Sequence, residues 1–337
     1  MRSAPYETRM KPYGLALLEL ARKRPEILCL SGDLTRQCEV DIFQEEIPER
    51  FIHGGMAEAN MIGVAGGLAR RGFLPYVHTF GVFATRRVYD QIAMAIAYPD
   101  LPVRIVGFMP GISSPGGPSH QAIDDVALMR ALPNMTVVDV ADATETRQAV
   151  EAIADAPGPV YLRLKRGEIP VLFDDDHRFD LGRAQVLREA GAEGNVSIIA
   201  SGMMVAAAAA AADVLEDSGV GVTLLNVPVI KPLDTDTIVA ATRRSSLVIT
   251  AENHTVIGGL GSAVAEVLAE NPVPAPLRRV GIPDVFAKGA KSAPYLFTEY
   301  GLSTARLVAT AWQGLGRRGP VPEVPTVAAS DDAYAPV

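Results

Sequence analysis

The sequence predicts an α/β protein of two domains, each a mostly parallel sheet flanked by helices. Three observations support this fold class. Short β-branched runs alternate with helical patterns along most of the chain, as in successive βαβ units. The strand-like runs are almost continuously apolar, which suits sheets covered on both faces. The chain also has 337 residues, 48% of them hydrophobic and 21% charged, which is enough for two compact domains.

The predicted elements follow one another in a regular order. In the first half, strands are predicted at residues 27–31, 74–79, 103–109, 136–140 and 160–165. In the second half, they are predicted at residues 196–200, 222–227, 247–250 and 277–280. Helical periodicity lies between them, at residues 57–71, 84–97, 122–131, 144–154, 205–217 and 262–270.

Changes in composition predict where the domains begin and end. Residues 171–194 are polar and rich in turn formers, so we expect them to link a domain of residues 1–170 to one of residues 195–318. Residues 319–337 are rich in proline and lack periodicity. They are expected to form an extended or disordered tail.

Charge and composition argue against several classes of protein. The sum of 31 basic and 39 acidic residues gives a net charge of −8, which does not favour nucleic-acid binding. The two cysteines, Cys29 and Cys38, are too few for a disulfide framework and fit no common zinc spacing. The amino terminus lacks an apolar signal core, and no stretch reaches the roughly 18 apolar residues of a membrane span. We therefore expect a soluble cytoplasmic protein with no membrane partner and no metal ligands of its own.

Three loops that follow predicted strands contain residues that could bind a ligand or take part in catalysis. Each of these residues also has a purely structural interpretation. Glu58 opens an apolar helix, where an acid offsets the helix dipole or, if buried, shares a proton. That helix is apolar nearly all round, so we expect it in a core or an interface. Phe80 and Phe83 have the spacing of core residues but could also form a pocket for a flat ring. His120 ends a loop rich in proline and glycine, where it is either structural or catalytic.

Together these segments resemble the carboxyl-terminal half of transketolase. The resemblance starts at SGDLT, residues 31–35, and runs through GMAEANMIGVAGGLA and YVHTFGVF. It continues through GPSHQAIDDVALMRALPNMTVVDVADATET, residues 117–146, and ends with IKPLD and GGLGSAVAE. It covers most of the chain in order. It implies a pyrimidine domain that binds thiamine diphosphate, followed by a transketolase carboxyl-terminal domain.

The resemblance implies a role for each residue that matches a family motif. Glu58 matches the glutamate that hydrogen-bonds N1′ of the cofactor's aminopyrimidine, where a shared proton prepares the ring to deprotonate the thiazolium carbon. Phe80 and Phe83 match aromatic residues that pack against the pyrimidine. Arg86 stands in place of a third aromatic. The cofactor-contacting positions implied in this way are Asp33, Leu34, Glu58, Phe80, Phe83 and Arg86.

At the substrate positions, two residues match the family and three depart from it. His120 matches a histidine that bonds the substrate's hydroxyl and developing oxyanion, and Arg166 matches an arginine that grips the sugar phosphate. Gln37, Phe108 and Gly116 replace a phosphate-contacting serine, a histidine and an aspartate. The substrate-contacting positions implied are Gln37, Phe108, Gly116, His120 and Arg166. The histidine and the aspartate that are replaced would each recognise part of a linear sugar, so their loss points to a modified ketose.

One family motif is missing. The sequence contains no GDG, the motif through which the family binds Mg²⁺ and the diphosphate. The resemblance therefore implies the B subunit of a split transketolase, whose A subunit holds the diphosphate and Mg²⁺ in an A₂B₂ heterotetramer. Such an enzyme transfers a two-carbon ketol unit from a ketose phosphate to an aldose phosphate, and apulose 4-phosphate is one candidate donor.

Three alternatives remain open at the level of sequence. The first is a subunit similar to 1-deoxyxylulose-5-phosphate synthase, and the second is one similar to the β subunit of pyruvate dehydrogenase E1. The third is a partner subunit without catalytic residues of its own.

Overall fold

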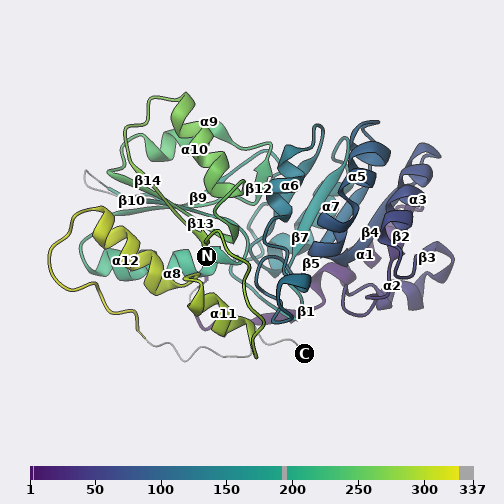
Figure 1. Cartoon of the computed structure of the whole chain (residues 1–337), viewed down its shortest axis with the longest axis horizontal. Coiled ribbons are helices and arrows are strands. Elements are labelled where there is room, and N and C mark those ends of the chain that lie inside the picture. Colours follow the sequence, from purple (N-terminus) through teal and green to yellow (C-terminus); the bar gives the residue numbers. More distant parts are fainter. Residues whose placement is uncertain (3, 192–195, 326–337) are drawn as a thin grey trace.

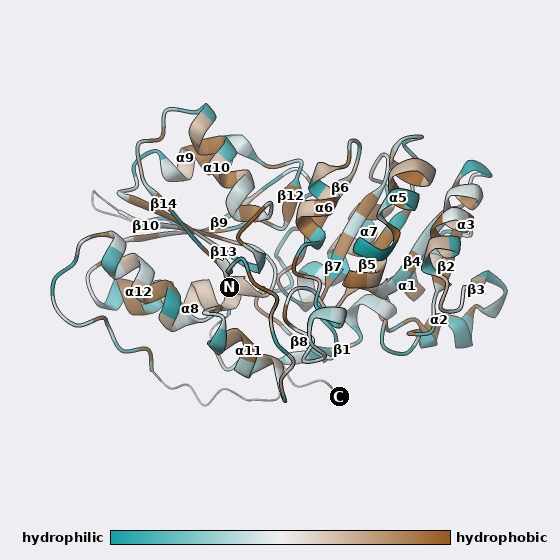
Figure 2. Cartoon of the chain, in the orientation of Figure 1, coloured by the Kyte–Doolittle hydropathy of each residue, from teal (hydrophilic) through white to brown (hydrophobic). Residues whose placement is uncertain are grey.

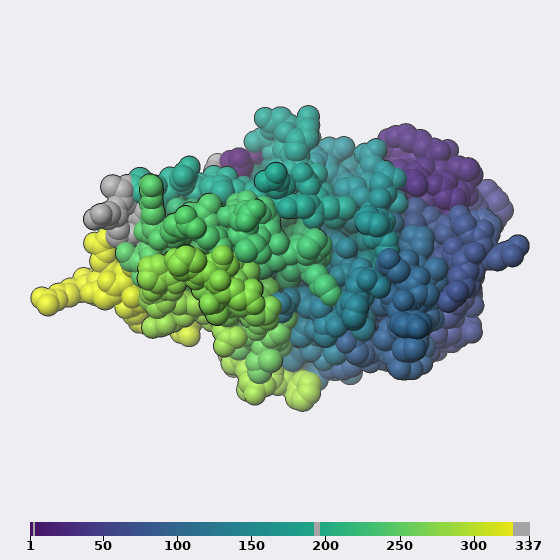
Figure 3. Space-filling model, turned by 90° about the horizontal axis from the view of Figure 1, so that it is seen from above, coloured from purple at the N-terminus to yellow at the C-terminus, as the bar shows by residue number. Residues whose placement is uncertain are grey.

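Two large sheets organise the chain, which a computed structural model describes over residues 1–2, 4–191 and 196–325. The first half of the chain forms most of a seven-stranded sheet and the second half a five-stranded one (Figure 1). The predicted α/β fold with two mostly parallel sheets is therefore confirmed. Figure 3 shows that the two halves occupy opposite ends of an elongated molecule. Of the predicted tail, residues 326–337 lie outside the described residues.

The seven-stranded sheet has the order β12-β6-β7-β5-β4-β2-β3. Its strands are β2 (Ile27–Ser31), β3 (Phe51–His53), β4 (Leu74–Phe80), β5 (Arg104–Phe108), β6 (Thr136–Asp139), β7 (Val160–Leu164) and β12 (Val229–Lys231). The pairs from β6 to β3 are parallel, and β12 is antiparallel to β6. One edge strand of this sheet therefore comes from the second half of the sequence.

Helices cover both faces of this sheet, as its apolar strands require. One core includes side chains of α1 (Pro12–Lys23), α2 (Asp41–Glu46) and α7 (Ala143–Ala154). The core on the other face includes α3 (Glu58–Arg70) and α6 (Asp125–Ala131). The short elements β1 (Thr8–Met10) and β8 (Glu168–Pro170) form a separate antiparallel pair, and η1 (Pro48–Arg50) precedes β3.

The five-stranded sheet has the order β14-β13-β10-β11-β9, with β9 antiparallel to β11. Its strands are β9 (Gln185–Arg188), β10 (Val196–Ala200), β11 (Val222–Asn226), β13 (Leu247–Thr255) and β14 (Leu277–Ile282). On one face lie α8 (Met204–Asp217), α11 (Ala293–Glu299) and α12 (Thr304–Gly314), and on the other α9 (Thr235–Thr242) and α10 (Leu260–Glu270) (Figure 1). Figure 2 shows apolar residues along the strands between these layers. In the described part of the chain, no helix is long and apolar enough to cross a bilayer.

The predicted continuous helix at residues 84–97 is wrong. The structure has four short pieces there: α4 (Gly81–Ala84), η2 (Arg86–Val88), α5 (Tyr89–Ile92) and the π-helical η3 (Ala93–Ala97). At the first break, the Thr85 hydroxyl donates a 2.7 Å hydrogen bond to the Gly81 carbonyl, and Thr85 has φ −125° and ψ −81°. Such a bond back to the preceding turn competes with the helix and bends it. The break turns the next two residues, Arg86 and Arg87, in different directions.

A buried ion network connects the two halves of the molecule. The Arg163 guanidinium donates two hydrogen bonds to the Asp125 carboxylate, at 2.7 and 3.0 Å, and one to Asp139 at 3.0 Å. It also donates to the carbonyl of Asn253 in β13, at 2.9 Å. The side chains of Arg163 and Asp125 are at most 1% exposed. Burial alone would raise the pKa of Asp125, but the charge and hydrogen bonds of Arg163 keep it below its ordinary value.

We predict that Asp125→Ala lowers the free energy of unfolding by about 3–5 kcal/mol, because it leaves the buried Arg163 charge short of its bidentate partner. Chemical denaturation monitored by circular dichroism measures this loss. The matched control is Asp155→Ala, which removes a carboxylate that is 76% exposed from its ion pair with Arg24. That change should cost less than about 1 kcal/mol. Equal losses in the two variants would contradict a structural role for the buried network.

Candidate active site

The candidate residues follow the carboxyl ends of neighbouring parallel strands. The strands β7, β5, β4, β2 and β3 are adjacent in the sheet, so the loops after them meet at one edge. The predicted residues follow these strands in turn: Asp33, Leu34 and Gln37 after β2, Glu58 after β3, Phe80, Phe83 and Arg86 at and after the end of β4, Gly116 and His120 after β5, and Arg166 after β7. Phe108 is the last residue of β5 itself.

Glu58 is the first residue of α3, and its side chain is only 6% exposed. It follows a sharp bend in which Gly55 has a φ of +66°, a conformation that favours glycine. The Glu58 carboxylate accepts a 2.7 Å hydrogen bond from Nη1 of Arg87. It therefore faces the segment after β4 and has a specific partner there, in addition to its favourable place at a helix amino terminus.

Aromatic side chains from two loops meet beside this carboxylate. The rings of Phe80 and Phe83 lie nearly parallel, with centroids 6.3 Å apart and an interplanar angle of 16°. The edge of the His120 imidazole meets the Phe83 ring, with centroids 5.4 Å apart and an angle of 75°. The guanidinium carbon of Arg87 lies 3.9 Å from the Phe83 ring centroid. A flat apolar surface, a carboxylate and an imidazole are thus brought together around Phe83.

His120 ends the short helix η4 (Pro118–His120) and is exposed. Its Nδ1 lies 2.9 Å from the Ser119 hydroxyl. Gly116 packs closely against it, because a Cβ at position 116 would lie 3.2 Å from the His120 Cβ. The glycine that departs from the family pattern therefore lets His120 pack close to the backbone of its own loop.

The second half of the chain holds the loop that carries His120. The Asn253 side chain accepts a 3.0 Å hydrogen bond from the Ile112 amide and donates another, also 3.0 Å, to the Pro110 carbonyl. The buried Gln121 side chain donates to the carbonyls of Ser114 and Lys288, at 3.0 and 3.3 Å. Residues of the carboxyl-terminal domain thus position a loop of the first domain, although none of them was predicted as a site residue.

Asp33, Gln37 and Arg166 lie near one another at this edge. Burial raises the pKa of the Cys38 thiol, and the charges of Arg166 and Asp33 act on the same thiol in opposite directions. Gln37 precedes Cys38 and is half-buried, as are Leu34 and Arg166, while Asp33 is exposed. The predicted phosphate-binding arginine follows β7, which β5 and β4 separate from β2, and its charge still acts on the residue next to Gln37.

Phe108 does not reach the surface in this structure. Its fully buried ring packs edge-on against Tyr13, with centroids 5.6 Å apart. The Tyr13 hydroxyl lies 2.6 Å from Nε2 of His78, whose pKa burial lowers to about 4. Since a neutral imidazole donates from one nitrogen and accepts at the other, His78 fits this buried position without charge. The substrate contact expected of Phe108 stays a prediction.

Two adjacent arginines face different parts of the site. Arg86 donates to the Pro118 carbonyl at 3.2 Å and to the Asp124 carboxylate at 3.4 Å, so it contacts the His120 loop. Arg87, which the sequence did not single out, bonds Glu58 and covers Phe83. The only signal for Arg87 was its position next to Arg86. Arg87 faces the Glu58 carboxylate and Arg86 does not, and both follow the break at Thr85, which was not predicted.

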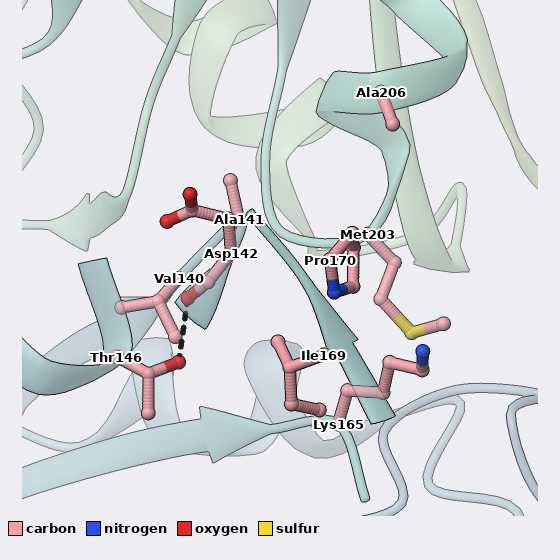
Figure 4. A pocket seen from close by; sticks show the side chains of 9 residues that line it. All are labelled: Val140, Ala141, Asp142, Thr146, Lys165, Ile169, Pro170, Met203 and Ala206. Atoms are coloured by element: carbon pink, nitrogen blue, oxygen red, sulfur yellow. Dashed lines mark hydrogen bonds between the residues drawn. The ribbon is translucent and has the colours of Figure 1, made fainter. Parts of the chain in front are cut away.

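A small cavity of about 20 Å³ lies between the two halves, with room for about one water-sized molecule. Figure 4 shows its lining, contributed by the segments around residues 140–146, 165–170 and 203–206. Burial lowers the pKa of Lys165 in this lining to about 8. The Lys165 amine donates a 2.5 Å hydrogen bond to the Glu168 carbonyl. In the described ranges, no group of three or more His, Cys, Asp or Glu side chains is arranged to hold a metal ion.

Two family models match the chain. The pyrimidine-binding domain of transketolase matches residues 8–171, and the transketolase C-terminal domain matches residues 182–307. The chain belongs to the transketolase family. This confirms the resemblance drawn from the sequence motifs, and the family generally uses thiamine diphosphate with a divalent metal.

Relatives within the transketolase family match nearly the whole chain. A transketolase family protein of Sinorhizobium fredii, y4mN, is 45% identical, and the match covers 91% of this chain and 88% of that protein. The 6-deoxy-6-sulfo-D-fructose transketolase subunit SqwH of a Clostridium species is 41% identical, with 93% and 98% covered. The B subunit of the apulose-4-phosphate transketolase of Phocaeicola vulgatus is 34% identical, with 89% and 95% covered.

A solved transketolase structure supports the same assignment. It is a split-gene transketolase described as an inactive β4 tetramer, and it superimposes with a TM-score of 0.83 at 43% identity. The match covers 92% of this chain and 98% of that one. That chain therefore shares the fold of this one over nearly its whole length.

We predict that Asn253→Asp loosens the loop at residues 110–117. The change keeps the shape of the side chain but removes the donor to the Pro110 carbonyl and places a charge against it, at a cost of about 1–3 kcal/mol. Hydrogen–deuterium exchange should show faster exchange of the Ile112 amide and its neighbours. The control is Asn271→Asp, which removes a similar bond to the Val267 carbonyl at the end of α10. Unchanged protection in the loop of the Asn253 variant would contradict this role.

Proposed function

We propose that the chain is the B subunit of a two-chain, thiamine diphosphate-dependent transketolase. It acts with an A subunit that holds the diphosphate and Mg²⁺, in an A₂B₂ heterotetramer. The complex transfers a two-carbon ketol unit from a ketose phosphate to an aldose phosphate. The two relatives named as subunits of transketolases, and their nearly complete alignment with this chain, support the split arrangement.

The observation that carries the proposal is the meeting of Glu58, Phe83 and His120. They come from loops after three different strands. His120 contacts Phe83, and both Glu58 and Phe83 contact Arg87. A nearly buried carboxylate beside an aromatic ring suits a planar ring that shares a proton with it. An exposed imidazole at the edge of the same ring suits an acceptor for the hydroxyl of a bound sugar. The carboxylate and the aromatic ring therefore suit the cofactor, and the imidazole suits the sugar.

These residues fit the aminopyrimidine end of thiamine diphosphate. Glu58 is an acceptor at a fixed position, and Phe80 and Phe83 present nearly parallel rings. Next to Phe80, the buried hydroxyl of Thr79 has no hydrogen-bond partner among the described residues. The cofactor would supply the nucleophilic carbon and the electron sink for carbon–carbon cleavage. The chain's own part is to bind the ring, hold a proton at N1′ through Glu58, and orient the sugar through His120.

The exposed side of α3 supports a partner at this edge. The helix was expected in a core or an interface, and Ala59, Asn60, Gly63, Val64 and Gly67 are exposed along it. Met56, two residues before Glu58, is 78% exposed. A mostly apolar exposed surface beside a nearly buried functional carboxylate is typical of an interface. We assign it to the A subunit, and the inactivity ascribed to the β4 tetramer of the split-gene relative agrees with this need for a second chain.

The proposed donor is a ketose with an anionic group at its far end. Arg166 lies at the edge where β2 and β7 end, and its planar guanidinium suits a phosphate or sulfonate. The two subunit relatives are named for a sulfo-sugar and for apulose 4-phosphate, which are both modified ketoses. Gly116 places no side chain next to His120, in line with a sugar that differs from the family's usual one. We therefore place branched or terminally modified ketoses first in a substrate panel.

The proposal is tested by producing the chain together with its A subunit, recognisable by GDG and a downstream asparagine. The purified complex, with thiamine diphosphate and Mg²⁺, is assayed for two-carbon transfer from apulose 4-phosphate, 6-deoxy-6-sulfofructose and xylulose 5-phosphate. Turnover of at least one ketose is expected. Consumption of pyruvate instead would favour the synthase or dehydrogenase alternatives, and no turnover of any ketose would overturn the proposal.

We predict that Glu58→Ala lowers turnover of the assembled complex by about 10²–10⁴-fold, because positioned proton transfer contributes roughly that factor. Size-exclusion chromatography should show that the complex still assembles. The control is Glu45→Ala, which removes an exposed carboxylate from α2. Full activity of the Glu58 variant would show that this chain acts only as a scaffold.

We predict that Arg166→Ala raises KM for a phosphorylated ketose about 10–100-fold, as expected for the loss of a charge-assisted hydrogen bond. His120→Ala should instead lower kcat, because it acts on charge that develops during the reaction. Steady-state kinetics with a phosphorylated and an unphosphorylated ketose separate the two effects. A KM that does not change in the Arg166 variant would remove this arginine from the phosphate site.

A further inference from the structure

Arg87 combines three contacts at the centre of the candidate site. Its Nη1 donates a 2.7 Å hydrogen bond to Glu58. Its guanidinium carbon lies 3.9 Å from the centroid of the Phe83 ring. Its side chain is 49% exposed, while that of Glu58 is 6% exposed. The arginine thus covers a carboxylate and a ring that the rest of the fold leaves facing the open edge.

A guanidinium in this position meets the same requirements as an aminopyrimidine. Both groups are planar, both can stack on a phenyl ring, and both can bond a carboxylate through nitrogen. Arg87 bonds Oε1 of Glu58 and covers the Phe83 ring, and the pyrimidine would need the same carboxylate and the same ring surface. Because two planar groups cannot lie on one face of Phe83 together, one has to leave before the other binds.

We propose that Arg87 occupies the place of the cofactor's pyrimidine ring in the free subunit and is displaced when the cofactor binds. The inference rests on the proposed function, since it takes the ligand to be thiamine diphosphate. Arg87 is then an internal competitor: it neutralises Glu58 and covers Phe83 until the ligand arrives. Cofactor affinity includes the cost of breaking this ion pair, and that cost is set by a residue outside the family motifs.

The local structure lets Arg87 move without disturbing its neighbours. It lies in η2, a single turn that follows the break at Thr85, and half of its side chain already faces solvent. The preceding Arg86 is held by the Pro118 carbonyl and Asp124, so the backbone remains anchored. A half-exposed arginine can transfer its charge to water at little cost. Its departure leaves the nearly buried Glu58 without a cation, ready to share a proton with a ring nitrogen.

The test compares Arg87→Met with the wild-type chain, each assembled with the A subunit. Methionine keeps an unbranched side chain but removes the guanidinium that lies over Phe83 and bonds Glu58. Isothermal titration calorimetry with thiamine diphosphate at saturating Mg²⁺ should give a Kd about tenfold lower for the variant, equivalent to about 1.4 kcal/mol. The control is Arg70→Met, which removes an exposed arginine from the other end of α3 and should leave the Kd unchanged. Thermal unfolding of each variant checks that the fold is retained.

The possible outcomes separate the two proposals. If the wild-type complex binds thiamine diphosphate and the Arg87 variant binds it equally well, displacement is overturned while the proposed function stands. If the variant binds more weakly, Arg87 is a direct contact of the bound cofactor and the inference is again wrong. A wild-type complex that binds no thiamine diphosphate would overturn the proposed function, and this inference with it.

Discussion

The orientation of the two halves of this chain depends on the buried charge of Arg163. An arginine without water must satisfy all its donors at once, and here its partners come from α6, β6 and β13. Asn253 links this network to the site, since its carbonyl accepts from Arg163 while its side chain holds the loop before His120. The start of the loop that leads to the imidazole is therefore held by a charge that lies two contacts away from it.

This arrangement explains what the carboxyl-terminal domain contributes. All the predicted site residues lie in the first 170 residues, at the ends of parallel strands. The second domain nevertheless supplies Asn253 and the Lys288 carbonyl, which fix both ends of the His120 loop. A loop rich in glycine and proline has little regular structure of its own, so contacts with the second domain order it.

Sequence patterns predicted the buried strands well because each is a continuous apolar run, and β2 and β10 agree with their predicted ranges at both ends. They missed five strands of only three or four residues, β1, β3, β8, β9 and β12, which are too short to give a continuous apolar run. They also missed the break at Thr85, which arises from a single side-chain hydrogen bond. Glu58 and His120 could be found because motifs mark them. Arg87 could not, since its direction depends on that break.

The strand β12 has a consequence for how the molecule could be divided. It closes the edge of the first sheet beside β6, although it follows three strands of the second sheet in sequence. A fragment that ended in the polar segment after β8 would expose the unpaired edge of β6, and open edges of this kind recruit other chains. The first domain therefore cannot be expressed alone with its sheet complete, whereas all five strands of the second sheet lie between Gln185 and Ile282.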